Sequence, residues 1–221
     1  MSARQRKIAA PMIDELRLID LAETDPVAIE AGGSYEGCRF SGADLADRNI
    51  SGATFTECEF FALEASGAEL RGARFIESRL ERANAAALKA ARTTWRDVHI
   101  DGSRFGAVEM FDATLESVRV SGSKLSFVNL RAAKLRDVHF DHCFIEELDL
   151  IDARADRVAF TDCTVGTLRL DHAQLRNVDL RGLDLSGISG VASMGGTIIS
   201  FSQSIDLAGA LAGNLGITVA D

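Results

Sequence analysis

An apolar residue recurs at every fifth position from Phe40 to Leu185, thirty times in succession without an exception. Because 47% of the chain is hydrophobic, chance would produce such a run roughly once in ten billion trials. An α-helix repeats after 3.6 residues and a β-strand after two, so neither explains a strict period of five. The chain is therefore predicted to turn a corner every five residues.

Within each five-residue unit, a second position also has the character of a core position; we call each of the five positions a phase. The residue two positions before each apolar centre is mostly small or aliphatic, and Arg48 is the only charged residue at these positions. Residues 38–187 contain 44 charged residues, of which 43 fall on the other three phases. Charged side chains remain in water unless they are paired. Two phases of the five are therefore predicted to face a core and three to face solvent.

Four corners close a square coil of twenty residues, and stacked coils pair at the inter-strand spacing of about 4.8 Å. Thirty five-residue units then give a solenoid of about seven and a half coils, roughly 36 Å long. We predict an all-β solenoid over residues 38–188, an N-terminal capping segment over 1–37 and a C-terminal cap and helix over 189–221. Glycines two residues after a centre suit corners with unusual backbone angles. They are Gly42, Gly52, Gly67, Gly72, Gly102, Gly122, Gly182 and Gly187.

The units resemble those of the pentapeptide-repeat proteins. Ala43-Asp44-Leu45 matches the family pattern of alanine, then aspartate or asparagine, then leucine or phenylalanine, and Ala53-Thr54-Phe55 and Ala83-Asn84 are looser copies. The period covers about two thirds of the chain. The resemblance implies a right-handed quadrilateral β-helix.

Composition limits the partners and the compartment. The formal net charge is −9, whereas a direct nucleic-acid binder would carry a basic footprint. No apolar stretch approaches the eighteen or so residues of a membrane span, so we expect a cytoplasmic protein without membrane contact.

No group of residues predicts catalysis or a metal. Cys38 and Cys58 are twenty residues apart on an inward phase, as are Cys143 and Cys163, so each pair is predicted to stack on adjacent coils. A four-thiolate zinc site fails because the pairs lie some 25 Å apart. Core packing and a disulfide within each pair are the alternatives. No nucleophile, base and orienting group converge, so we expect neither enzyme activity nor a cofactor.

Two groups of outward side chains are candidate partner-binding residues. Acidic side chains recur from coil to coil along one face, and two phenylalanines fall on one face of adjacent coils beside a later acidic cluster. A network of surface ion pairs with neighbouring arginines, and the ordinary exposure of single hydrophobic residues, are the alternative accounts. The predicted partner-binding residues are Glu57, Glu77, Asp97, Asp137, Glu146, Glu147, Phe127 and Phe144.

The two ends depart from the period. Residues 12–21 are rich in apolar side chains and are predicted to form a cap, a strand or a short helix. The sequence Ser200-Phe201-Ser202-Gln203 has the spacing of a capping box and predicts a helix. That helix either covers the last coil or meets its copy in a second subunit. The predicted dimer residues are Ile205, Ala208, Leu211, Ala212 and Leu215.

The resemblance extends to function. MfpA-type and Qnr-type pentapeptide-repeat proteins dimerise through their C-terminal ends and mimic duplex DNA. They bind DNA gyrase and topoisomerase IV, modulate supercoiling and influence fluoroquinolone resistance. The uninterrupted repeat here is more similar to the MfpA type. The resemblance therefore implies a homodimeric, DNA-mimicking gyrase binder.

An interaction rod with a partner other than a topoisomerase is the alternative. Duplex DNA about 36 Å long carries roughly twenty negative charges, whereas residues 38–187 contain 24 acidic and 20 basic residues. A shared fold also does not establish a shared function.

Overall fold

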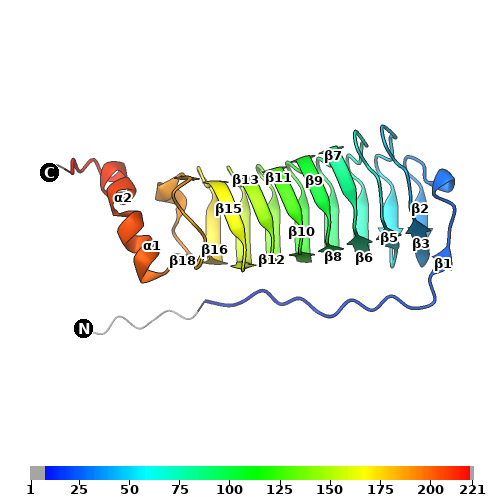
Figure 1. The fold of residues 1–221 in the computed structure, drawn as a ribbon, viewed down its shortest axis with the longest axis horizontal. Coiled ribbons are helices and arrows are strands. Elements are labelled where there is room, and N and C mark those ends of the chain that lie inside the picture. Colours follow the sequence, from blue (N-terminus) through cyan, green and yellow to red (C-terminus); the bar gives the residue numbers. More distant parts are fainter. Residues whose placement is uncertain (1–7, 220–221) are drawn as a thin grey trace.

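The repeat folds into a parallel β-solenoid of about nine turns, as the period predicts (Figure 1). It is the right-handed quadrilateral β-helix that the family resemblance implies. The computed structural model describes residues 8–219, so residues 1–7 and 220–221 of the predicted terminal segments lie outside it. The coil count exceeds the predicted seven and a half because the chain on each side of the repeat adds partial turns. Strand β1 (Ala22–Glu23) pairs with the first coil, and β18 (Thr197–Ile198) pairs with the last.

The strands form two parallel sheets, of which the twelve-stranded one runs the length of the rod and the six-stranded one begins at residue 84. The twelve-stranded sheet contains β1, β2 (Ser34–Glu36), β3 (Cys38–Ser41), β4 (Thr54–Thr56), β5 (Glu59–Phe61), β6 (Arg74–Glu81), β8 (Thr94–Asp101), β10 (Thr114–Ser121), β12 (Lys134–Asp141), β14 (Arg154–Thr161), β16 (Gln174–Asp179) and β18. The six-stranded sheet contains β7 (Asn84–Lys89), β9 (Arg104–Glu109), β11 (Lys124–Asn129), β13 (Phe144–Asp149), β15 (Thr164–Arg169) and β17 (Ile188–Ser189).

Residues twenty apart are neighbours on adjacent coils, as Leu115 and Leu135 show. We number the four faces of a coil by their apolar centres and assign to each face the two residues on either side of its centre. The first face has centres at residues 40 to 180 in steps of twenty, the second at 45 to 185, the third at 50 to 170 and the fourth at 55 to 175. Residues that share a position on successive coils form a column along the rod.

The two inward phases build one continuous core. Its first coils are filled by stacked aromatic rings: centroid distances are 5.0 Å between Phe40 and Phe60, 5.1 Å between Phe55 and Phe75, and 4.3 Å between Phe75 and Trp95. The middle coils are mostly aliphatic and enclose a cavity of about 50 Å³ lined only by apolar side chains. The core is therefore packed differently along its length.

The corners explain the glycine pattern. Seven of the eight predicted corner glycines have positive φ; the exception is Gly187. The corner between the second and third faces changes along the rod. It is left-handed at Asp47 and Gly67 but carries no positive φ from β7 to β15, where the strand runs through it. There a Cβ on Gly106 would lie 2.2 Å from the carbonyl oxygen of Ala86, so this glycine permits a close backbone approach.

The N-terminal cap lies at residues 22–37, within the predicted capping segment. It includes a 3₁₀ turn, η1 (Pro26–Ala28), and the buried Ile29. The only charged residue on an inward phase, Arg48, belongs to this closure. Its guanidinium donates to the carbonyls of Pro26 (3.0 Å), Val27 (3.3 Å) and Ile29. The apparent exception to the pattern therefore satisfies the last backbone acceptors at this end.

The apolar segment before the cap instead lies along the rod (Figure 1). We call residues 8–21 the strap. Its backbone is bound to the rod by hydrogen bonds from Ala9 N to Asn177 Oδ1 (3.3 Å) and from Met12 N to Asp137 Oδ1 (2.9 Å). The strap thus passes over several coils at the corner between the fourth and first faces.

The C-terminal end is closed by the predicted helical segment. After a 3₁₀ turn, η2 (Val191–Ser193), the chain forms α1 (Phe201–Asp206) and α2 (Ala208–Asn214), and the capping box between Ser200 and Gln203 is present. The buried Gln203 also donates from Nε2 to the carbonyls of Leu180 and Leu183, both at 2.7 Å. None of the helices within residues 8–219 has the length and apolar character needed to cross a membrane.

Candidate partner-binding surfaces

In the predicted acidic column on the fourth face, only some of the carboxylates are exposed and unpaired. Glu57 and Glu77 are exposed, whereas the half-buried Asp97 lies 3.7 Å from Arg96. Asp137 is buried, and two nitrogens of the Arg157 guanidinium each donate to one of its oxygens at 2.6 Å. These hydrogen bonds lower the pKa of Asp137. Asp137 therefore stabilises the fold and holds the strap, and it does not present a free carboxylate to a partner.

The strap covers a second part of this corner. A groove of about 640 Å³ between strap and rod is lined by His99, Arg119 and His139 on the rod and by Ile13 and Asp14 on the strap, among others. Burial is the main reason why the pKa of both imidazoles is lowered. Lowered pKa values favour neutral imidazoles beneath the strap.

The later predicted group is brought together on the second face. Phe127 and Glu147 are direct neighbours on adjacent coils, and Glu146 is exposed beside them. Phe144 is 43% exposed and lies in another column, where the Lys124 ammonium is 5.5 Å from its ring centroid. Glu147 is half-buried and bound to an arginine, so the free negative charge of this group is concentrated at Glu146.

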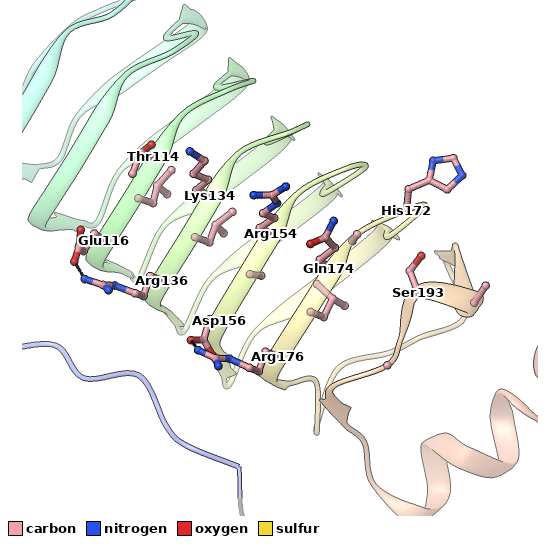
Figure 2. A pocket seen from close by; sticks show the side chains of 17 residues that line it. Thr114, Glu116, Lys134, Arg136, Arg154, Asp156, His172, Gln174, Arg176 and Ser193 are labelled. Carbon is pink, nitrogen blue, oxygen red and sulfur yellow. Dashed lines mark hydrogen bonds and ion pairs between the residues drawn. The ribbon is translucent and has the colours of Figure 1, made fainter.

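A basic groove on the outer surface of the fourth face was not predicted. It has a volume of about 800 Å³ and lies towards the C-terminal end of the rod. Figure 2 shows Lys134, Arg154 and Gln174 in a row along it, with the turn that carries Ser193 beyond Gln174. The signal was present in the sequence, because these side chains belong to a single column without an acidic member.

The C-terminal helices present apolar side chains to solvent. Exposed fractions are 83% for Phe201, 60% for Ile205 and 75% for Leu215, whereas Leu207 is 3% exposed. Of the other predicted dimer residues, Ala208 and Leu211 are exposed and Ala212 is half-buried. The predicted stripe therefore does not cover the last coil, which is closed instead by Gln203 and Leu207.

The cysteines lie in the core as unpaired thiols. Cys58 and Cys143 are buried, and Cys38 and Cys163 are partly buried. Burial raises the pKa of Cys58 to about 11, which keeps it a neutral thiol at physiological pH. Within residues 8–219 no three or more His, Cys, Asp or Glu side chains are grouped so that they could hold a metal ion.

The repeat is similar to repeats of a known protein family. Residues 38–75 match the family model for pentapeptide repeats, with eight copies. A search of curated protein sequences gives no match. The family match concerns the repeat itself.

Two kinds of solved structure are similar to this chain. A trypsin-treated variant of QnrB1, a plasmid-mediated fluoroquinolone resistance protein, is 19% identical and superposes with a TM-score of 0.40 over 86% of this chain and 91% of that one. HetL is a pentapeptide-repeat protein involved in heterocyst differentiation regulation in the cyanobacterium Nostoc sp. strain PCC 7120. It is 17% identical, with a TM-score of 0.39 over 76% and 90%. Superpositions this loose say nothing about the surfaces, whose properties come from this chain's own residues.

Proposed function

This chain belongs to the pentapeptide-repeat proteins, and from that premise we propose that it is a homodimeric rod that binds partner proteins along its faces. The regular coils fix each outward side chain in a column at the inter-strand spacing. Charged and apolar groups are thus held in place before a partner arrives, which lowers the entropic cost of binding.

The apolar surface of the C-terminal helices is the observation that supports the proposed dimer. Phe201, Ile205 and Leu215 are exposed by 60% or more, although neighbouring Leu207 is buried. A cluster of exposed apolar side chains at one end of a rod is typical of an association surface. A second copy related by a two-fold axis would bury the same cluster on both subunits.

A specific observation also favours DNA gyrase or topoisomerase IV as a partner. In residues 38–187 the second and third faces together carry twelve acidic and eight basic residues, whereas the first and fourth faces carry twelve of each. The negative charge is thus concentrated on two adjacent faces, as a DNA mimic requires. Its net value of −4 is still small beside the roughly twenty charges of duplex DNA of equal length. Topoisomerase binding is therefore the second candidate.

A supercoiling assay with purified DNA gyrase separates the two candidates. A DNA mimic is expected to change supercoiling or fluoroquinolone-induced cleavage at micromolar protein, and to lose this effect at higher salt. Glu146→Lys should weaken the effect, whereas Asp162→Lys, at an exposed position on the first face, is the matched control. No effect of the wild-type protein at either salt concentration excludes the topoisomerase and leaves the interaction rod.

The dimer is tested independently of the partner. Light scattering is expected to give twice the monomer mass of 23.7 kDa. A monomer at all concentrations up to about 100 µM, well above typical dissociation constants of stable dimers, would contradict the proposed association.

A further inference from the structure

A column of hydrogen-bond donors runs along the outer surface of the fourth face, one residue before each centre. Its members stack directly, as the pairings of Thr114 with Lys134 and of Lys134 with Arg154 show. Arginine, lysine, threonine and glutamine side chains all carry donor groups, and no member of the column is acidic. The column consists of Thr54, Arg74, Thr94, Thr114, Lys134, Arg154 and Gln174.

The neighbouring column does not neutralise these charges. Its carboxylates are already occupied: Glu116 is paired with Arg136, and Asp156 binds both Arg176 and Arg157. Over residues 8–219 no carboxylate oxygen lies within 4.0 Å of a side-chain nitrogen of Lys134 or Arg154. Two uncompensated positive charges therefore stand about one coil spacing, roughly 4.8 Å, apart.

The groove gives this charge a defined shape. It extends over the column from Thr114 to Gln174 and reaches the turn at residues 191–195 (Figure 2). Three coil steps correspond to roughly 14 Å, which is the length of four or five residues in an extended chain. The groove therefore suits a short linear ligand that lies along the rod axis.

We propose that this groove binds a short, extended acidic segment of a partner protein. Carboxylates of the segment pair with Lys134 and Arg154, and the planar Arg154 guanidinium can hold one of them through two parallel hydrogen bonds. Thr114 and Gln174 lie at either end of the charged pair and donate to the backbone carbonyls of the segment. The site is separate from the proposed dimer surface and goes beyond the proposed function.

The surroundings favour a short acidic peptide over a nucleic acid. The whole chain has a net charge of −9, and exposed carboxylates of Asp112 and Asp152 stand at the adjacent corner of the rod. These carboxylates flank the groove on the same coils as Thr114 and Arg154, so a polyanion wide enough to reach that corner would be repelled. A single extended segment of four or five residues can follow the column without covering that corner.

The binding is measured by fluorescence anisotropy with a labelled hexapeptide of alternating glutamate and alanine. Lys134→Glu combined with Arg154→Glu is expected to weaken binding by about tenfold or more, because two attractive charge pairs become repulsive. The matched control combines Arg104→Glu with Lys124→Glu. It makes the same charge change at two exposed positions of the second face. We expect the control to change the affinity by less than about twofold.

Each other outcome overturns the proposal. Equal losses in both variants mean that the peptide responds only to overall charge, and no saturable binding to wild-type protein means that there is no site. Tighter binding of a hexathymidine oligonucleotide through the same two residues identifies a nucleic-acid site. Self-association that is lost only in the groove variant identifies a second copy as the occupant. If the reversal variant does not fold, Lys134→Gln combined with Arg154→Gln replaces it and is expected to weaken binding in the same direction.

Discussion

The two ends of the rod close their last coils by the same chemistry but leave different surfaces behind. At the N-terminal end, Arg48 reaches from the coil to the cap and binds three carbonyls. At the C-terminal end, Gln203 reaches from the cap to the coil and binds two. Both polar side chains satisfy backbone acceptors that no further coil can pair. Beyond these closures, among residues 8–219 only the C-terminal end has α-helices, and these expose several apolar side chains.

The residues that close the solenoid are therefore different from the residues of the proposed association surface. The backbone acceptors at each end are satisfied within one chain, so a partner is not needed to complete the fold. The apolar cluster of α1 and α2 is then available for a second copy. Changes at the closures should affect stability, whereas changes at the outer helix surface should affect association.

The largest effect is expected from Arg48→Met. The substitution keeps the apolar stem but leaves the carbonyl oxygens of Val27 and Ile29 without a donor, whereas that of Pro26 still accepts from Ile29 N. We expect the free energy of unfolding, measured by urea denaturation, to fall by about 2 to 3 kcal/mol. Arg104→Met, at an exposed position on the second face, should change it by less than about 0.5 kcal/mol. Equal small effects would show that the N-terminal closure contributes little.

Gln203→Leu is expected to have a somewhat smaller effect at the other end. It removes the hydrogen bonds from Gln203 Nε2 to two carbonyls, of which that of Leu180 still accepts from Leu183 N, and it removes one side of the capping box, so stability should fall by about 2 kcal/mol.

Gln203→Glu sharpens this test through pH. A carboxylate facing two carbonyl oxygens is disfavoured, so its pKa in the folded chain should be raised above about 4.3. The protonated acid can donate one hydrogen bond, so stability should be retained below the unfolded pKa and lost as pH rises through the folded one. A stability difference from wild type that does not change with pH would argue against the proposed contact.

The association surface should respond to Leu215→Arg without a change in fold stability. The leucine is 75% exposed at the C-terminal end, and Val27 is 78% exposed at the N-terminal cap. Leu215→Arg is expected to raise the dimer dissociation constant at least about tenfold, whereas Val27→Arg should not. Sedimentation equilibrium measures both. Equal behaviour of the two variants would remove the proposed distinction between the ends.

The smallest effect concerns the strap that runs between the ends. Burial lowers the pKa of His99 and His139, so the unfolded chain binds protons there more readily than the folded chain. Their contribution to stability is therefore present above about pH 6.5 and is lost as pH falls through the lower folded values. We expect less than about 1 kcal/mol. Deleting residues 8–20 should return both pKa values towards 6.5 in an NMR titration, and unchanged values would show that the strap does not bury them.

The period of five predicted the parts of the fold that depend on residues twenty apart. Coil register, the two inward phases and the corner positions all follow from it, and the capping box at Ser200 predicted the helix. The close approach at Gly106 was not predicted, because a corner that loses its left-handed residue has no signature in the apolar phases.

Contacts outside the period account for the remaining differences. Asp137 occupies an outward phase yet is buried, because the strap and Arg157 cover it. Arg48 occupies an inward phase yet is satisfied by the cap. Phase predicts where a side chain points, but not which distant segment lies over it. The basic groove differs from these cases, since its column could have been read directly from the sequence.

The strap also determines how the rod should unfold. In a solenoid each coil contacts only its neighbours, so coils can be lost one after another from either end. Hydrogen bonds from Ala9 to Asn177 and from Met12 to Asp137 join residues 168 and 125 positions apart. Together with the pairing of β1, they connect the beginning of the chain to the first coil and to two late ones. Fraying of the C-terminal coils must release this connection, so hydrogen exchange in the late coils should be slower, and unfolding more nearly all-or-none, than in a rod of the same coils without the strap.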